Sequence, residues 1–262
     1  PRGASLRLGP LTVAEVGTLV ACTGTVPPHL TDRLHAHTGG NPSYLHAVLA
    51  ELARRPERRH ATLPVPREVE GWVGRAMDGC APGTRRLVEA ASALGARVPD
   101  RVSLSIAATL GDVDDPLAAL DDAVLAGLLE VRDEPAIRDI AFPHPLVQAA
   151  VYEQLGPATR ARLHHHAAHL VTGEGARLRH RVAAAHPPDD TLAAELSDFA
   201  ERQARTGAWA GAATTLIEAS HLTTTTHNHK QTHHRGLTAK IHHGNPVHPT
   251  TTARGTPLHC NA

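Results

Sequence analysis

The first candidate site is the stretch HTGGNPSYLHAVLAEL, in which two glycines, an asparagine and a proline precede an apolar-periodic run. Gly39 suits the end of one helix, and Asn41 followed by Pro42 suits the cap and first position of the next. Helix capping therefore explains every residue of this turn except Gly40. The alternative is that Gly40, Asn41 and Pro42 allow the backbone and a helix N-terminus to approach an anionic ligand closely.

The second candidate is His144, which stands directly before Pro145 and repeats the same cap-then-proline pattern. An imidazole can donate a hydrogen bond to a phosphate oxygen. The simpler interpretation is that His144 only caps the helix that follows or faces solvent. Both interpretations remain open at the level of sequence.

The other histidines, the cysteines and the possible catalytic combinations do not predict a functional site. His165 and His169 are four residues apart on an expected helix, but no third ligand is nearby, so an exposed helix face is favoured and no metal site is predicted. Cys22, Cys80 and Cys260 are too far apart in sequence to suggest a disulfide framework, and the first two are expected in the core. No Ser/His/Asp or Cys/His arrangement stands out, so we predict no catalytic residues.

The elements that must position these residues are mainly helical. Aromatic residues make up only 2% of a 262-residue chain, so the core must be built from Leu, Val and Ala, which favours packed helices. Residues 1–55 are expected to form a small helical bundle that begins with a capping box at Thr12 and Glu15. The third helix of this bundle should bury one stripe, namely Leu45, Val48, Leu49 and Leu52.

The rest of the chain is expected to form three further parts. Residues 56–81 are expected to form a proline-broken connector and a short helix. Residues 82–172 have the order of a winged helix, with three helices, a β-hairpin from LLEVRDE and IRDIAFPH, and closing helices. In its third helix, Leu117, Leu120, Val124 and Leu128 lie in register. Residues 173–222 read as two helices at the start of TPR-like repeats. The tail, 223–262, is rich in His, Thr and Pro, is expected to be disordered, and suggests a shifted reading frame.

Composition narrows the class of protein. The formal net charge is zero, so there is no general basic signature for nucleic acid or an anionic membrane. No apolar run is long enough to cross a bilayer, and the three scattered cysteines suit a reducing, cytoplasmic setting. The N-terminal PRGASLRLGP lacks a signal-peptide core and reads like the middle of a longer protein.

In combination, several stretches resemble the large ATP-binding LuxR-type transcriptional regulators, which belong to the STAND group of signal-transducing ATPases related to the AAA superfamily. They are HTGGNPSYLHAVLAEL, ALGARV, LLEVRDEPAIRDIAFPHPLVQAAVYEQLGPATRARLHHHAA and AERQARTGAWAGAATTLIEAS, and the resemblance spans about residues 5–222. It implies a lid, a winged helix and the start of helical repeats. It also implies that Gly40, Asn41, Pro42 and His144 contact ATP or ADP in the complete regulator.

The chain departs from that family's pattern in ways that bear on activity. It has no G-x-x-x-x-G-K-[ST] phosphate loop, no acidic strand end to hold Mg²⁺, and no basic recognition helix at its end. We therefore expect no enzyme activity and no tight nucleotide binding from this chain alone. The resemblance implies that an N-terminal ATPase core and C-terminal repeats with a DNA-binding helix-turn-helix lie outside it, so that DNA is bound only through that absent domain.

The expected function is thus a fragment of an ATP-dependent regulator that contributes nucleotide-sensing lid and winged-helix modules. Two alternatives remain: a freestanding protein-interaction scaffold and a winged-helix DNA-binding protein. The DNA-binding alternative is disfavoured, because the candidate recognition helix at 115–128 carries Asp115, Asp121 and Asp122 but no Lys or Arg.

Overall fold

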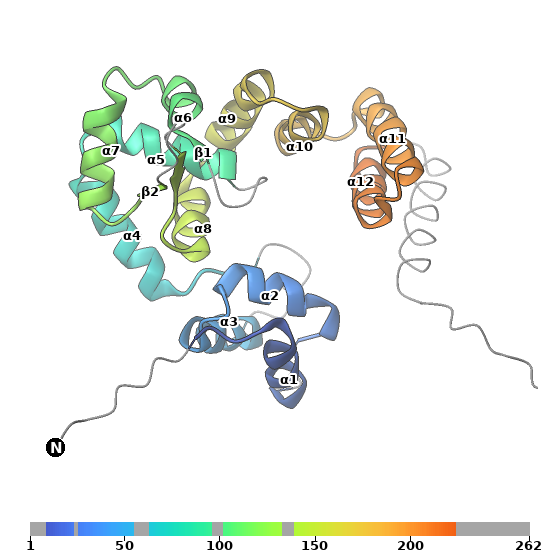
Figure 1. Cartoon of the computed structure of the whole chain (residues 1–262), viewed down its shortest axis with the longest axis horizontal. Coiled ribbons are helices and arrows are strands. Elements are labelled where there is room, and N and C mark those ends of the chain that lie inside the picture. The colour runs from blue at the N-terminus through green and yellow to red at the C-terminus, as the bar shows by residue number, and fades with distance from the viewer. Residues whose placement is uncertain (1–8, 24–25, 55–62, 96–101, 133–138, 224–262) are drawn as a thin grey trace, which may run out of the picture. The chain divides into compact units, whose positions relative to one another are not determined.

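The computed structural model (Figure 1) describes residues 9–23, 26–54, 63–95, 102–132, 139–223 of the chain. It is mainly α-helical, with one small antiparallel sheet, as the sequence predicts. The chain divides into two compact units, Pro1–Ala184 and Ala185–Ala262. Within the described residues, no helix is both long and apolar enough to cross a membrane.

The first part of unit 1 is a bundle of three α-helices and one 3₁₀ turn, η1. Their bounds are α1 Val13–Thr23, η1 Pro28–Leu30, α2 Thr31–Thr38 and α3 Pro42–Arg54. The predicted capping box is confirmed, because Glu15 Oε2 accepts from the backbone N–H of Thr12 at 2.8 Å while the Thr12 hydroxyl accepts from the N–H of Glu15 at 3.3 Å. The predicted stripe of α3 is buried, and it packs with apolar residues of α1 and α2 into one core.

A second, larger core lies in the winged-helix region. Its elements are α4 Arg67–Gly79, α5 Pro82–Gly95, β1 Val102–Ser103, α6 Leu104–Gly111, α7 Pro116–Leu125, β2 Glu130–Arg132 and β3 Asp139–Ala141. The predicted hairpin is confirmed as the antiparallel pair β2–β3. The stretch VSLSIAATLG, residues 102–111, is predicted as the second of the three helices, but its first two residues, Val102 and Ser103, form β1 instead. β1 lies on the other edge of β3, which gives the strand order β1-β3-β2. Pairing with β3, which is distant in sequence, overrides the local helical pattern here.

The buried face of α7 differs from the predicted one. Leu120 is 3% exposed and Leu128 fully buried, but Leu117 and Val124 are 51% and 40% exposed. Ala119 and Ala123 face the core in their place. Small alanines let α7 pack closely on α5, so the larger aliphatic side chains are turned outward.

Three more helices complete unit 1: α8 Pro145–Gln154, α9 Pro157–Leu170 and α10 Glu174–Ala184. A buried chain of polar rings links them. The Tyr152 hydroxyl lies 2.7 Å from His164 Nε2, and His164 Nδ1 lies 2.9 Å from His180 Nδ1. Both imidazoles are fully buried. At that distance one Nδ1 must donate to the other, so the two facing atoms can hold only one hydrogen between them.

Unit 2 contains a helical hairpin in its described part, α11 Asp190–Arg205 and α12 Trp209–Leu222. The small residues Ala200, Ala204 and Ala212 lie at the contact between the two helices, together with Leu216. Residues 173–222 thus contain three helices rather than the two expected, because they also include α10. This helix packs on α9 and belongs to unit 1. The expected disorder of the tail concerns residues outside those described, apart from Thr223.

Candidate functional site

The Gly39–Pro42 turn is built as the sequence predicts. Gly39 ends α2 in the left-handed conformation, with φ +58°. The Asn41 side-chain carbonyl accepts from the backbone N–H of Ser43 at 2.9 Å, and Pro42 begins α3. Gly39, Pro42 and Ser43 are exposed, so this turn presents the start of α3 to solvent.

Gly40 has a structural role that the sequence did not reveal. Its φ is +70°, and an added Cβ would lie only 2.3 Å from the carbonyl oxygen of Leu11. The backbone N–H of Leu11 donates to the Gly40 carbonyl at 2.8 Å, and the Leu11 carbonyl accepts from His35 Nε2 at 3.0 Å. Close approach does explain this glycine, but in this structure the approaching group is the chain's own backbone.

His144 is the N-cap of α8, as predicted. The backbone N–H of Leu146 donates to His144 Nδ1 at 3.1 Å. Because Nδ1 accepts, the neutral ring carries its hydrogen on Nε2, and Nε2 donates to the Thr38 carbonyl at 3.0 Å. Both ring nitrogens of His144 are therefore engaged.

The structure brings the two candidate sites together. Thr38, the last residue of α2, and His144 are 106 positions apart in sequence, yet they share a hydrogen bond. An added Cβ on Gly39 would lie 3.1 Å from His144 Nε2, and the Tyr44 ring meets the His144 ring edge-on at 4.7 Å. These residues lie where α2 packs against α8 (Figure 1). The N-terminal helical bundle thus touches the winged-helix region at residues singled out by sequence.

A second histidine adds to the electrostatics of this contact. Desolvation by burial is the main cause that lowers the pKa of His37, and the nearby imidazole of His144 lowers it further, although a hydrogen bond to the Pro64 carbonyl opposes this. Burial also lowers the pKa of His144, against the opposing effect of the Thr38 carbonyl. Both rings are therefore favoured as neutral, and a neutral His144 offers one N–H donor.

Sequence reasoning missed several residues of this site. Thr38 contributes only its carbonyl, which any residue type could supply, and His37, Tyr44 and Leu11 carry no motif. Only the tertiary packing of α2 on α8 identifies them.

Comparison with family models, with curated proteins and with solved structures finds no match. The site has to be judged on its geometry.

The structure also shows where the other histidines and cysteines considered in the sequence lie. His165 and His169 are exposed, with ring centroids 5.3 Å apart, and across the described residues no group of three or more His, Cys, Asp or Glu side chains could hold a metal ion. Cys80 is buried as expected, whereas Cys22 is exposed. The prediction that Cys22 lies in the core was wrong. Val16 and Val20 form the buried side of α1, and Cys22 lies on its solvent side.

Proposed function

We propose that this chain supplies the nucleotide-sensing lid and winged-helix modules of an ATP-dependent LuxR-type transcriptional regulator. The observation that supports the proposal most is the hydrogen bond between His144 Nε2 and the Thr38 carbonyl. It joins the end of α2, directly before the turn Gly39–Pro42, to the start of α8. This turn and His144 each precede a helix N-terminus that could face a phosphate. ATP or ADP would be held mainly by a P-loop ATPase core that this sequence does not contain.

The mechanism we propose is an exchange of hydrogen-bond acceptors. The single Nε2–H of neutral His144 can donate to Thr38 O or to a phosphate oxygen, but not to both with good geometry. A bound ADP phosphate would compete for this hydrogen and fix α8 beside the nucleotide. Without it, the ring returns to Thr38, as in the present structure. Nucleotide exchange would then bias two arrangements of lid and winged helix.

The test is ADP retention by the chain joined to its ATPase core. His144→Asn keeps an N-cap acceptor but shortens the side chain, and His144→Ala removes both functions. Loss of one hydrogen bond should speed ADP dissociation by about tenfold in both variants, and transcription without inducer should rise. The matched control is His166→Ala, an exposed residue of α9. Unchanged ADP retention and transcription in both His144 variants would overturn the proposal.

A protein-interaction scaffold is the second candidate. It is favoured by large apolar side chains that stay exposed in unit 1: Trp72, Leu117, Val124, Leu125 and Val131. Leu125 is 88% exposed at the end of α7. If this apolar surface binds other protein molecules, sedimentation should show concentration-dependent association that Leu125→Asp abolishes. ADP retention would be unaffected by that change, which separates the two candidates.

A further inference from the structure

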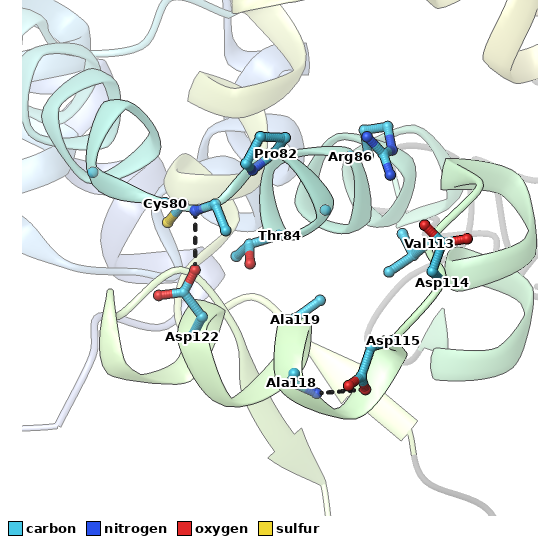
Figure 2. Close-up of a pocket in the computed structure, with 13 residues that line it drawn as sticks. Cys80, Pro82, Thr84, Arg86, Val113, Asp114, Asp115, Ala118, Ala119 and Asp122 are labelled. Carbon is cyan, nitrogen blue, oxygen red and sulfur yellow. Dashed lines mark hydrogen bonds between the residues drawn. The ribbon is translucent and has the colours of Figure 1, made fainter.

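A cavity of about 780 Å³ lies between the N-terminal end of α5 and the helix α7 (Figure 2). It is far from the turn of Gly39 in sequence, and none of the residues discussed above as nucleotide contacts line it. Its walls come from the segment Gly79–Thr84, from Arg86, and from residues of 113–122. This volume is typical of sites that take small organic molecules.

The most informative residue in the cavity is Thr84. Its side chain is 1% exposed, and Figure 2 shows its hydroxyl directed into the space between α5 and α7. Among the described residues this hydroxyl has no hydrogen-bond partner. The hydroxyl oxygen itself is not fully enclosed, because the buried unpaired side-chain atoms of the described residues do not include it. It can therefore form a hydrogen bond with water or with a ligand that enters the cavity. Thr84 therefore marks a position where a ligand oxygen would be stabilised.

The charges of the residues that line the cavity favour a ligand of one charge. Three carboxylates line the cavity, Asp114, Asp115 and Asp122, against one guanidinium, Arg86. The Arg86 guanidinium already donates two hydrogen bonds within the chain, from Nε to Gly111 O at 3.1 Å and from Nη2 to Asp112 O at 3.0 Å. The excess of negative charge disfavours anions and favours a cation.

The carboxylates keep acceptor capacity for such a cation. Asp115 Oδ1 accepts from the N–H of Ala118 at 3.1 Å, and Asp122 Oδ2 accepts from the N–H of Ala81 at 3.2 Å, so each uses one oxygen for the backbone. Asp114 is exposed and has no partner within the part of the chain that the structure describes. An ionised carboxylate can accept several hydrogen bonds, so all three remain available to an ammonium group.

The spacing of these groups argues against a metal ion as the cation. The described acidic, thiol and imidazole side chains form no group of three or more that could surround a metal. The Cys80 thiol at the edge of the cavity donates to Ala76 O at 3.2 Å, and burial, followed by the charge of Asp122, raises its pKa. It is therefore a protonated thiol rather than a metal ligand.

We infer that this cavity binds a small organic ammonium compound. Its charged nitrogen would meet Asp114 and the neighbouring carboxylates, its short aliphatic part would contact Val113, Ala118 and Ala119, and a carbonyl or hydroxyl oxygen would accept from Thr84. Such a ligand bridges α5 and α7. This inference rests on the cavity alone and does not depend on the proposed nucleotide-sensing role.

Three probes of equal chain length test the inference on the purified chain. They are 6-aminohexanamide, which is cationic, hexanamide, which is neutral, and 6-amino-6-oxohexanoate, which is anionic. Binding is followed by amide chemical shifts of Gly83, Thr84 and Val113. The cation should bind saturably and about tenfold more tightly than the neutral amide, as one charge-assisted contact predicts. The anion should not bind.

Four variants locate the site. Asp114→Asn and Thr84→Val should each lower the affinity for the cation by about three- to tenfold. Thr84→Ser keeps the hydroxyl and should bind the cation as the parent chain does. Asp198→Asn, the same charge change at an exposed position of α11, is the matched control. If Thr84→Val fails to fold, Asp114→Asn and Thr84→Ser still decide the question.

Three results would overturn the inference: no saturable binding of the cation, binding of hexanamide with equal affinity, or an equal loss of affinity for the cation in Asp198→Asn and Asp114→Asn. A free amine and a lysine side chain share this chemistry. A further arm therefore compares 6-aminohexanamide with N-acetyl-lysine methylamide, and tighter binding of the second would assign the ligand to a peptide.

Discussion

Gly39 and Gly40 are neighbours with the same backbone handedness but different surroundings. Gly39 faces the terminal nitrogen of a flexible side chain, His144 Nε2, whereas Gly40 faces the backbone oxygen of Leu11. A side-chain neighbour can rotate away, but a backbone neighbour moves only with its segment. The two positions should therefore differ in their tolerance of a methyl group.

We expect Gly40→Ala to destabilise the chain more than Gly39→Ala does. The positive φ should cost both variants about 1–2 kcal/mol. The contact of 2.3 Å between the new Cβ and Leu11 O should add to this in Gly40→Ala alone. Urea unfolding measures both free energies. Gly39→Asn serves as the control, because Asn tolerates the left-handed conformation, and equal losses for the two alanine variants would contradict the expectation.

At the scale of elements, α8 depends on a titratable N-cap. His144 accepts from the Leu146 N–H through Nδ1, which is the atom that a second proton would occupy. Protonation would therefore remove the cap of α8 and place a positive charge near His37. The N-cap of α8 thus requires the neutral form of His144, whereas the Nε2–H that donates to Thr38 O is present in both forms.

Stability should consequently fall on acidification. Burial lowers the pKa of His144 and of His37 in the folded chain below the ordinary value of 6.5. Below that value the unfolded chain binds more protons than the folded one, so the free energy of unfolding decreases as the pH drops from neutral through 6.5 and below. His144→Asn, which keeps a cap acceptor, should reduce this pH dependence in urea unfolding between pH 7.5 and 5. His166→Asn is the matched control, and an unchanged slope in His144→Asn would refute the assignment.

For the whole molecule, the distribution of charge bears on nucleic-acid binding. The formal net charge is zero, and α7, in the place of a recognition helix, carries Asp121 and Asp122 and no Lys or Arg. Beside the exposed Asp121, its solvent-facing side carries apolar side chains, at Leu117, Val124 and Leu125. Such a surface gains nothing from the release of counterions from DNA.

We therefore predict no gel shift of duplex DNA by this chain, even at about 50 mM salt, where electrostatic binding is strong. Val124→Lys with Leu125→Lys provides the converse control, since new positive charge on α7 should create weak, salt-sensitive binding. A shift by the unmodified chain that weakens with salt would reinstate the winged helix as a DNA-binding domain.

The sequence by itself determined most local features. Helix limits around Gly39, Asn41, Pro42 and Pro145, the capping box at Thr12, and the hairpin all follow from interactions between residues close in the chain. These depend on backbone φ preferences and on side chains bonding to neighbouring N–H groups, so one segment contains the information. The buried stripe of α3 was predictable for the same reason, because its period fixes one face.

Tertiary structure alone decided the features that need two distant segments. The addition of β1 to the sheet, the outward turn of Leu117 and Val124, and the buried pairing of His164 with His180 each depend on a partner far along the chain. The sequence singled out Gly40 and His144 separately, but not that Leu11 would require the glycine or that Thr38 would accept from the imidazole. Backbone carbonyls leave no mark on residue type, so only the packing of α2 against α8 could reveal their role.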